Sequence, residues 1–302
     1  MRFPLCFLFC GVLLWFLWDA IAIRSAVTEA LRLCAGSVIP AMFPFLVISN
    51  LLIMLGLGDV LAPAFAGVMS RLFRLPGTAG SALLLGLTGG YPIGAKTAAD
   101  LYRSGLLTRE ETQRLLTFCN NANPAFFLSV LGVGVFHSIR VGLYLWLIHL
   151  LSALLSGWFL CRKHTYTAIS QHPPIRNGSP DSFSVLWVSA VGSALQSILS
   201  ICAFVIIFYV LTRPLASLPG LWGTAATGTM ELFSLIPRLS NDSASLILAS
   251  ALSGWGGLSV LCQTASMLAG TDLSIFSCIK GKLLQCLFSA LFAALLVHFC
   301  IV

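Results

Sequence analysis

The sequence predicts an all-α polytopic membrane protein built from inverted repeats, with two re-entrant helical hairpins and two broken transmembrane helices. Of its 302 residues, 58% are hydrophobic and only 9% are charged, whereas soluble domains carry roughly 25% charged residues. Apolar runs near or above the ~18–20 residues that a membrane helix needs recur along the chain. These runs show no strand-like alternation, and backbone groups in lipid must bond within their own segment, so the spans are expected to be helices.

Composition also excludes several classes of protein. The net charge is +7, but the basic residues are spread between apolar runs, so we expect the lipid bilayer as a partner and no nucleic acid. The ten cysteines form no CxxC pair, which argues against a metal or disulfide framework. There is no HExxH, P-loop or GxSxG motif, and the five histidines are expected at span ends or in a loop. We therefore expect no enzyme, no catalytic residue, no metal and no resident cofactor.

Residues 1–24 predict an N-terminal transmembrane helix. Arg2 precedes the long apolar run Phe3–Ile23. A cleavable signal peptide is the alternative, because small residues follow the run. However, the run exceeds the ~7–15 residues of a signal-peptide core, so a retained helix is favoured.

Residues 25–161 form the first predicted repeat. Glycines and a proline interrupt a re-entrant hairpin at about 78–102, and "CNNANP" interrupts a broken helix at about 115–136. Between them, Thr108 can cap a helix with Glu111 at the capping-box position. The remaining parts are an amphipathic stretch at 27–33, a span at 38–57, an interfacial segment at 59–75 and a span at 141–160.

A polar cytoplasmic loop at 162–184 precedes the second predicted repeat, residues 185–302. This repeat opens with a span at 185–211 and closes with one at 279–301. Between these lie a Gly-rich hairpin at about 218–237 and a helix at about 245–269 that "SGWGGLS" interrupts. Whether residues 218–237 re-enter or cross fully is left open.

The distribution of basic residues supports opposite orientations for the two repeats. With the N-terminus in the cytoplasm, eleven lysines and arginines, Lys280 and Lys282 among them, fall on the cytoplasmic side. Five fall on the outer side and Lys96 lies inside the first hairpin, which accounts for all 17. This asymmetry follows the positive-inside rule. Three crossings separate the repeats, so they are inverted.

The stretch "GLTGGYPIGAK" suggests a binding site at the first hairpin. Glycines and prolines free backbone groups that become ligands where a segment lines a cavity. Inserting a lysine at the centre of a membrane costs roughly 3 kcal/mol of free energy unless an anion compensates its charge. Lys96 is therefore a candidate anion ligand, although it can instead pair with Asp100 or extend to the interface. The candidate residues of this hairpin are Gly89, Gly90, Tyr91, Gly94, Lys96 and Thr97.

Polar residues at the other interruptions complete the candidate site. Glu231 is the only acid deep in the second half and is expected to carry a proton, bind a cation or contact substrate. A buried salt bridge with Lys96 is the alternative. The amides and hydroxyls at the two broken helices serve either as ligands or as interhelical contacts. These residues are Asn120, Asn121, Asn123, Ser253, Gly254, Gly257, Ser259 and Gln263.

Four stretches carry a family resemblance that covers nearly the whole chain. "PAMFPFLVISNLL", "TGGYPIGAKTAADL", "LTREETQRLLTFCNNANPAFF" and "GWGGLSVLCQT" resemble sporulation integral membrane proteins of the YlbJ type, of the nucleoside-recognition or gate-domain group. That group is distantly similar to concentrative nucleoside transporters. The resemblance implies their two re-entrant hairpins, two broken helices and inverted repeats.

The resemblance also assigns residues by position. The substrate-binding hairpin tip of nucleoside transporters matches Gly94, Ala95, Lys96 and Thr97, and their second-hairpin acid matches Glu231. A lysine replaces the amide, hydroxyl and acid expected at the first tip, which argues for an anion over a neutral nucleoside. Resemblance to the sporulation family implies dipicolinate, moved from the mother cell across the outer forespore membrane.

We therefore expect a multi-pass cell-membrane transporter of a small organic anion, working by alternating access; the resemblance implies dipicolinate as that anion. The alternatives are a nucleoside or nucleobase transporter and a non-transporting assembly protein of the spore envelope. The coupling ion, Na⁺ or H⁺, is left open. The oligomeric state is also open, although nucleoside transporters suggest a trimer.

Overall fold

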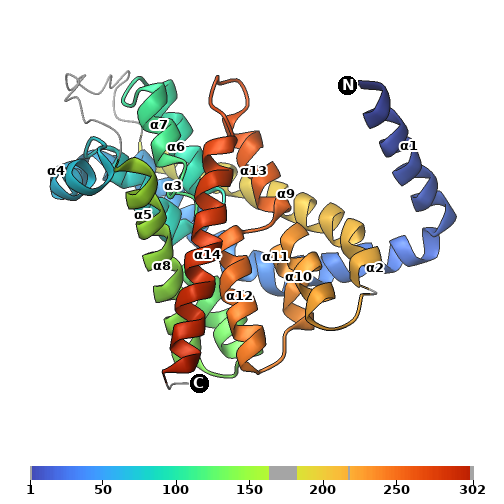
Figure 1. The fold of residues 1–302 in the computed structure, drawn as a ribbon. Coiled ribbons are helices and arrows are strands. Elements are labelled where there is room, and N and C mark those ends of the chain that lie inside the picture. The colour runs from blue at the N-terminus through green and yellow to red at the C-terminus, as the bar shows by residue number, and fades with distance from the viewer. Residues whose placement is uncertain (1, 163–181, 217, 300–302) are drawn as a thin grey trace.

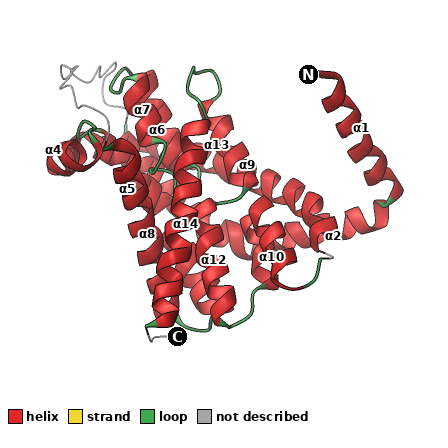
Figure 2. Cartoon of the chain, in the orientation of Figure 1, coloured by secondary structure: helices red, strands yellow, loops and turns green. Residues whose placement is uncertain are grey.

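The computed structural model describes residues 2–162, 182–216 and 218–299, and this part of the chain is helical without strands (Figures 1 and 2). In its first part the elements are α1 (Arg2–Trp18), α2 (Ala20–Leu33), η1 (Cys34–Val38), α3 (Ile39–Met54), α4 (Leu57–Val68), η2 (Met69–Phe73), α5 (Ala79–Gly89), α6 (Ile93–Arg103), α7 (Arg109–Leu115), η3 (Phe126–Val135) and α8 (Ile139–Cys161). The later elements are α9 (Phe183–Ala216), α10 (Gly220–Met230), α11 (Leu232–Leu235), η4 (Ile236–Arg238), α12 (Ser243–Trp255), α13 (Leu258–Leu268) and α14 (Phe276–His298). Most of the predicted loop at 162–184 lies outside the described residues.

Several helices are long and apolar enough to cross a membrane. Within the described residues these are Ile139–Cys161, Phe183–Leu215, Ser243–Leu268 and Phe276–His298, and the bent pair Cys6–Trp18 and Ala20–Val38 counts as a fifth if it forms one span. Large apolar side chains cover much of their outer surface. The protein is thus an integral membrane protein, as its composition predicts.

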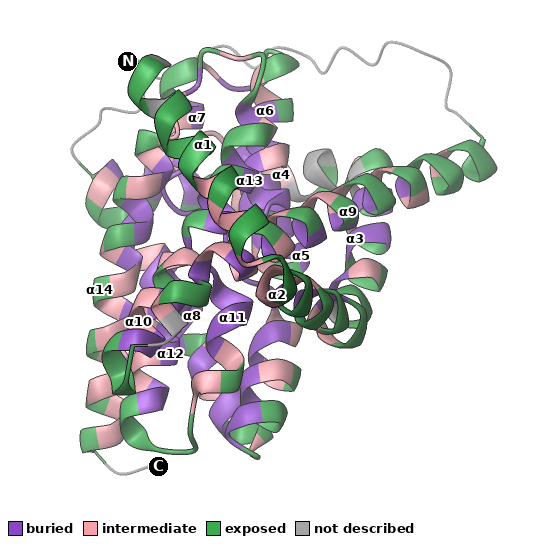
Figure 3. Cartoon of the chain, turned by 90° about the vertical axis from the view of Figure 1, so that its right-hand side faces the viewer, coloured by how far each residue is buried: buried purple, intermediate pink, exposed green. Residues whose placement is uncertain are grey.

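The N-terminal helix is shorter than expected, because it ends at Trp18 instead of Ile23. The chain turns by 94° at Asp19 and continues as α2. α1 stands apart from the other helices in Figure 1, and its surface is largely exposed in Figure 3. α2 instead packs on α9: the Arg213 guanidinium donates to the Ala22 carbonyl at 2.8 Å, and the Tyr209 hydroxyl donates to Glu29 at 3.2 Å. These contacts hold α2 against α9, at a large angle to α1.

Two of the predicted spans are also shorter as helices. The segment expected at 38–57 contains α3, which has 16 residues, and the segment expected at 115–136 contains η3, which has 10. In the second case residues 120–123 are in no helix. The Asn123 side-chain oxygen accepts from the Phe126 amide at 2.9 Å, where the chain becomes helical again before η3. Residues 120–123 therefore interrupt the span for about one helical turn, and the Asn123 side chain provides a hydrogen bond to the backbone where the helix resumes.

The capping box predicted before α7 is confirmed. The Thr108 hydroxyl accepts from the Glu111 amide, and the Glu111 carboxylate accepts from the Thr108 amide at 2.9 Å. Each partner satisfies a donor that the start of a helix leaves free. This fixes where α7 begins, just ahead of the asparagine segment.

The helices α8, α12 and α14 pack side by side (Figure 1). Small residues allow close packing: a side chain at Gly254 would meet the Gln285 carbonyl at 2.9 Å, and one at Gly281 would overlap the Thr117 carbonyl. Figure 3 shows buried residues concentrated along the inner faces of these helices. The packing brings a polar face of α14 into the interior.

A polar cluster joins the two halves of the chain where α6 and α7 meet the loop before α14. Asp272 accepts from the Tyr102 hydroxyl at 2.7 Å and forms an ion pair with Arg109 at 3.0 Å. Arg103 donates to the carbonyls of Met267 and Ala269. The hydrogen bond from Tyr102, and then the Arg109 charge, keep the pKa of Asp272 below its usual value. The cluster ties the end of α13 to the first half.

Candidate functional site

Four interruptions of the helices meet at one place in the interior. They are the turn after α5, the segment 120–123, the break between α10 and α11, and the glycine pair between α12 and α13. A side chain at Gly90 would meet Asn123 at 3.0 Å, and one at Gly256 would meet the Tyr91 hydroxyl at 3.1 Å. One at Gly257 would meet the Met230 carbonyl at 3.2 Å. The three glycines have positive φ, so only glycine adopts these turns at low cost.

Tyr91 lies at the centre of this meeting point. Its side chain is buried, and its hydroxyl donates to the Ser253 carbonyl at 3.0 Å. Ser253 lies in α12, one turn before the helix breaks. Tyr91 therefore connects the α5–α6 turn directly to the second half of the chain.

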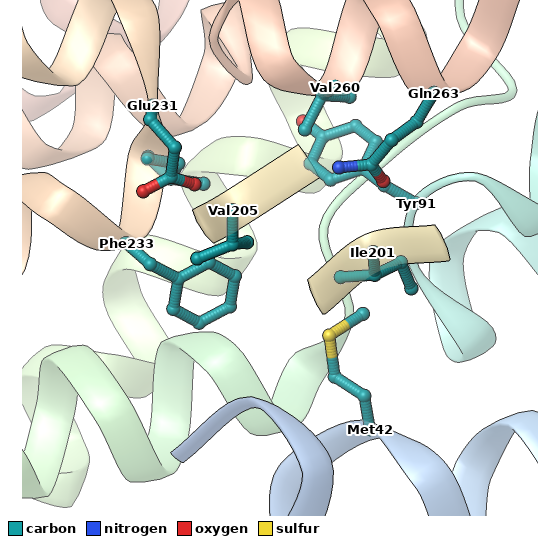
Figure 4. A pocket seen from close by; sticks show the side chains of 9 residues that line it. Met42, Tyr91, Ile201, Val205, Glu231, Phe233, Val260 and Gln263 are labelled. Atoms are coloured by element: carbon teal, nitrogen blue, oxygen red, sulfur yellow. The ribbon is translucent and has the colours of Figure 1, made fainter. Parts of the chain in front are cut away.

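A pocket opens beside Tyr91, with polar groups on opposite sides. Figure 4 shows the Glu231 carboxylate on the left, and the Tyr91 ring and Gln263 amide on the right. Ile201 and Val205 of α9 contribute part of the apolar wall. The complete lining is Met42, Tyr91, Ile201, Val205, Glu231, Leu232, Phe233, Val260 and Gln263. A polar solute here would be oriented by few groups within an apolar wall, as is usual for ligand sites.

The pocket is small in this conformation. The space its lining leaves admits about one water molecule. An aromatic dicarboxylate or a nucleoside does not fit unless the surrounding helices move.

Glu231 is held by the start of α11. Its carboxylate accepts from the Ser234 amide at 2.5 Å and from the Ser234 hydroxyl at 2.9 Å. Both bonds use one oxygen, Oε2, and the residue is buried. No ion pair between Glu231 and Lys96 occurs among the described residues, so the predicted alternative of a salt bridge does not hold in this conformation.

The three asparagines are all buried and have separate partners. Asn120 donates to the Thr264 hydroxyl at 2.8 Å, and Asn121 donates to the Phe118 carbonyl at 2.7 Å. The Asn120 oxygen and the Asn123 side-chain nitrogen lack partners within the described structure. Buried amide atoms normally have partners. These two atoms are consequently available to a water molecule or a solute, and the ligand role of the asparagines stays a prediction.

The second broken helix contributes differently along its length. Gln263 reaches the pocket and donates to the Ser259 hydroxyl at 3.3 Å. Ser253 bonds back to the Ala249 carbonyl, and Gly254 provides the close contact with α14. Gly257 adjoins Glu231. Of these residues, Gln263 lines the pocket itself.

The first hairpin likewise separates into packing and polar positions. A side chain at Gly94 would overlap the Cys119 carbonyl, so Gly94 allows α6 to approach the asparagine segment. Gly89 is buried at the end of α5, and the buried Thr97 hydroxyl has no partner among the described atoms. Lys96 does not line the pocket: its ammonium lies 3.8 Å from Asp100, and its side chain is 34% exposed.

Two interior residues were missed from the sequence. Lys282 was placed on the cytoplasmic surface, but its side chain is only 1% exposed, inside the bundle. His149 was placed at a span end, but it is buried in the middle of α8. A signal existed for Lys282: in "KGKLLQC" the lysine and Gln285 are three residues apart and share one helix face.

Lys282 joins Tyr91 to a buried polar network. Its ammonium donates to the Tyr91 hydroxyl at 3.3 Å and to the Gln285 side-chain oxygen at 2.8 Å, and it lies 4.8 Å from the centre of the Tyr91 ring. The Gln285 amide donates to Asn121 at 3.0 Å and contacts the His149 ring. The His149 ring in turn accepts from the Ala122 amide at 3.2 Å. The network connects α14, α8 and the asparagine segment behind the pocket.

Comparisons with known proteins agree with the motifs in the sequence. Residues 35–140, which include the first hairpin and the asparagine segment, match the family model Gate, described as nucleoside recognition. The sporulation integral membrane protein YlbJ of Bacillus subtilis (strain 168) is 29% identical over 300 residues, covering 86% of this chain and 74% of the relative. No solved structure matches the chain. The resemblance predicted from the motifs is thereby confirmed: this chain contains a nucleoside-recognition Gate region and is similar over most of its length to a sporulation integral membrane protein.

Proposed function

We propose that this protein is a membrane transporter that moves a small organic anion by alternating access between two inverted repeats. One observation carries the proposal: the four helix interruptions, far apart in sequence, meet around Tyr91 and the pocket. Paired interrupted segments in two halves of a chain are the usual sign of a transporter site near the bilayer midplane. A protein with only a scaffold role has no need to collect its costly helix breaks in one place.

The proposed cycle begins from the small pocket of this conformation. Its walls come from α5–α6 and α3 in the first half and from α9, α10–α11 and α13 in the second. Movement of the α5–α6 and α10–α11 hairpins would enlarge the pocket towards one side of the membrane at a time. The Asp272 cluster, which ties the two halves together at α6 and α7, would have to open on its side.

For the solute we propose dipicolinate during spore formation, with the outer forespore membrane as the location. Support comes from similarity to a relative whose name specifies sporulation. Chemistry adds a second reason, since the Asn123 side-chain nitrogen, which has no partner among the described atoms, can donate to a carboxylate. Glu231 would serve as the second polar contact or as the carrier of the coupling ion, Na⁺ or H⁺.

A nucleoside or nucleobase is the second candidate, favoured by the description of the matched Gate region as nucleoside recognition. An assembly protein of the spore envelope without transport is the third. Proteoliposomes containing the purified protein separate the three. We expect uptake of labelled dipicolinate and not of uridine, measured with and without a sodium or proton gradient. Uptake of uridine alone would favour the nucleoside, and uptake of neither by folded protein would favour assembly.

Lys96→Ala is expected to lower dipicolinate uptake at least tenfold if movement of the α5–α6 hairpin brings the Lys96 ammonium, which in this conformation pairs with Asp100 outside the pocket, to the solute. Asp100→Asn is the companion variant: it removes the carboxylate that Lys96 and Arg103 share and is expected to keep uptake. Exposed pairs of this kind contribute under about 1 kcal/mol to stability, so both variants should reach the membrane in normal amounts, as measured by immunoblot. Normal uptake by Lys96→Ala would mean that Lys96 is only the surface partner of Asp100.

A further inference from the structure

Lys282 is a buried cation without an anionic partner. Its side chain is 1% exposed, and no carboxylate oxygen of the described residues lies within 4.0 Å of its ammonium. Its hydrogen-bond acceptors are the neutral Tyr91 hydroxyl and the neutral Gln285 amide oxygen. Buried charges in proteins are otherwise paired, because an isolated one is costly to remove from water.

The groups around Lys282 are neutral at physiological pH. They are the thiols of Cys119 and Cys278, the Tyr91 phenol and the His149 ring. Phenols and thiols lose their protons only above neutral pH in their ordinary state, and imidazole that accepts a hydrogen bond from the Ala122 amide is in its neutral form. When the Lys282 amine is protonated, its positive charge therefore has no compensating partner among these groups.

The charge lies directly behind the pocket. Tyr91 lines the pocket with its ring, and Lys282 contacts both that ring and the Tyr91 hydroxyl. Glu231, the acid of the pocket, lies across the pocket from the Tyr91 ring (Figure 4), and no ion pair joins it to Lys282 among the described residues. In a water-poor interior, a charge one side chain away acts strongly on a solute.

We propose that Lys282 is the charge-selecting residue of the transport site: its ammonium positions Tyr91 and makes the chamber favourable for an anion. This inference rests on the proposed transport function and specifies which buried group selects the substrate class. An anion that enters the chamber compensates the charge that the protein leaves unpaired. A neutral solute of equal shape gains nothing from it.

Lys282→Met distinguishes a role in selecting an anionic solute from a structural role, because methionine keeps the side-chain volume and removes the charge. The variant is expected to raise the melting temperature of the empty protein in detergent by a few degrees, since replacing an unpaired buried charge by an apolar side chain often stabilises a protein. It should also abolish the rise in melting temperature that dipicolinate produces. Uptake of dipicolinate into proteoliposomes should fall at least tenfold. Any rise in melting temperature produced by the neutral analogue pyridine-2,6-dicarboxamide should not become smaller.

Two further variants complete the test. Lys280→Met makes the same substitution two residues away at an exposed position. It should leave the dipicolinate-induced rise in melting temperature and the uptake of dipicolinate unchanged. Lys282→Arg keeps the charge and should retain part of the dipicolinate response. A Lys282→Met protein that is less stable when empty but binds dipicolinate with unchanged affinity would overturn the role of Lys282 and leave the proposed transport function standing. A wild type that neither binds nor transports dipicolinate would overturn the proposed substrate and this inference with it.

Discussion

Glu231→Gln is expected to reduce gradient-driven dipicolinate accumulation at least tenfold while the protein stays folded. Glutamine keeps a side-chain oxygen that can accept from the Ser234 amide and hydroxyl, so the start of α11 retains its hydrogen bonds. The substitution removes only the negative charge and the site for a proton. A buried carboxylate in a membrane protein is costly and is typically retained for function.

Two transport measurements distinguish the roles of Glu231. If it carries the coupling ion, the variant should lose accumulation under a gradient but still exchange labelled for unlabelled dipicolinate across the membrane. If it contacts the solute, both activities should fall. Glu110→Gln removes an exposed acid from α7 and serves as the control. Full gradient-driven accumulation by Glu231→Gln would exclude both roles.

Gly281→Ala is expected to destabilise the protein more than any surface substitution, by at least about 3 kcal/mol, as overpacking against backbone can. A methyl group at this position would overlap the carbonyl oxygen of Thr117. Neither backbone can move freely, because α14 also packs closely on α12 through Gly254. The expected result is a large fall in melting temperature and in the yield of protein extracted from membranes.

Gly192→Ala is the matched control for this stability measurement. Gly192 lies within α9, and a methyl group there would meet no atom within 4 Å. Alanine favours a helix interior by up to about 1 kcal/mol over glycine, so this variant should be as stable as wild type or more so. A Gly281→Ala protein as stable as Gly192→Ala would show that α14 does not approach Thr117 so closely.

Much of the site was predictable because its residues interrupt local patterns. Glycines and prolines within apolar runs marked the turn at Gly90 and the break at Gly257, and an isolated acid marked Glu231. These signals are local, since a helix break or a charge in lipid is costly wherever it occurs. The capping box at Thr108 was also predictable, because it needs only two residues three positions apart.

Other predictions failed because they depended on packing between distant segments. Lys282 looked like a flanking surface charge, as it lies near the beginning of a span, yet the close contact of Gly281 with Thr117 turns its face of α14 inward. The bend at Asp19 likewise follows from the packing of α2 on α9. A single helix's hydrophobicity contains no information on either contact.

The sequence by itself determined that this is a helical membrane protein, where its helices are interrupted, and which proteins it resembles. Hydropathy, glycine and proline act over a few residues, so composition and spacing are sufficient for those conclusions. Only the tertiary structure decided that Tyr91 lies where the four interruptions meet, and that Lys282 stands behind it while Lys96 pairs with Asp100. Those relations depend on which helix faces pack together, and close approach between segments more than 100 residues apart is set by the whole fold.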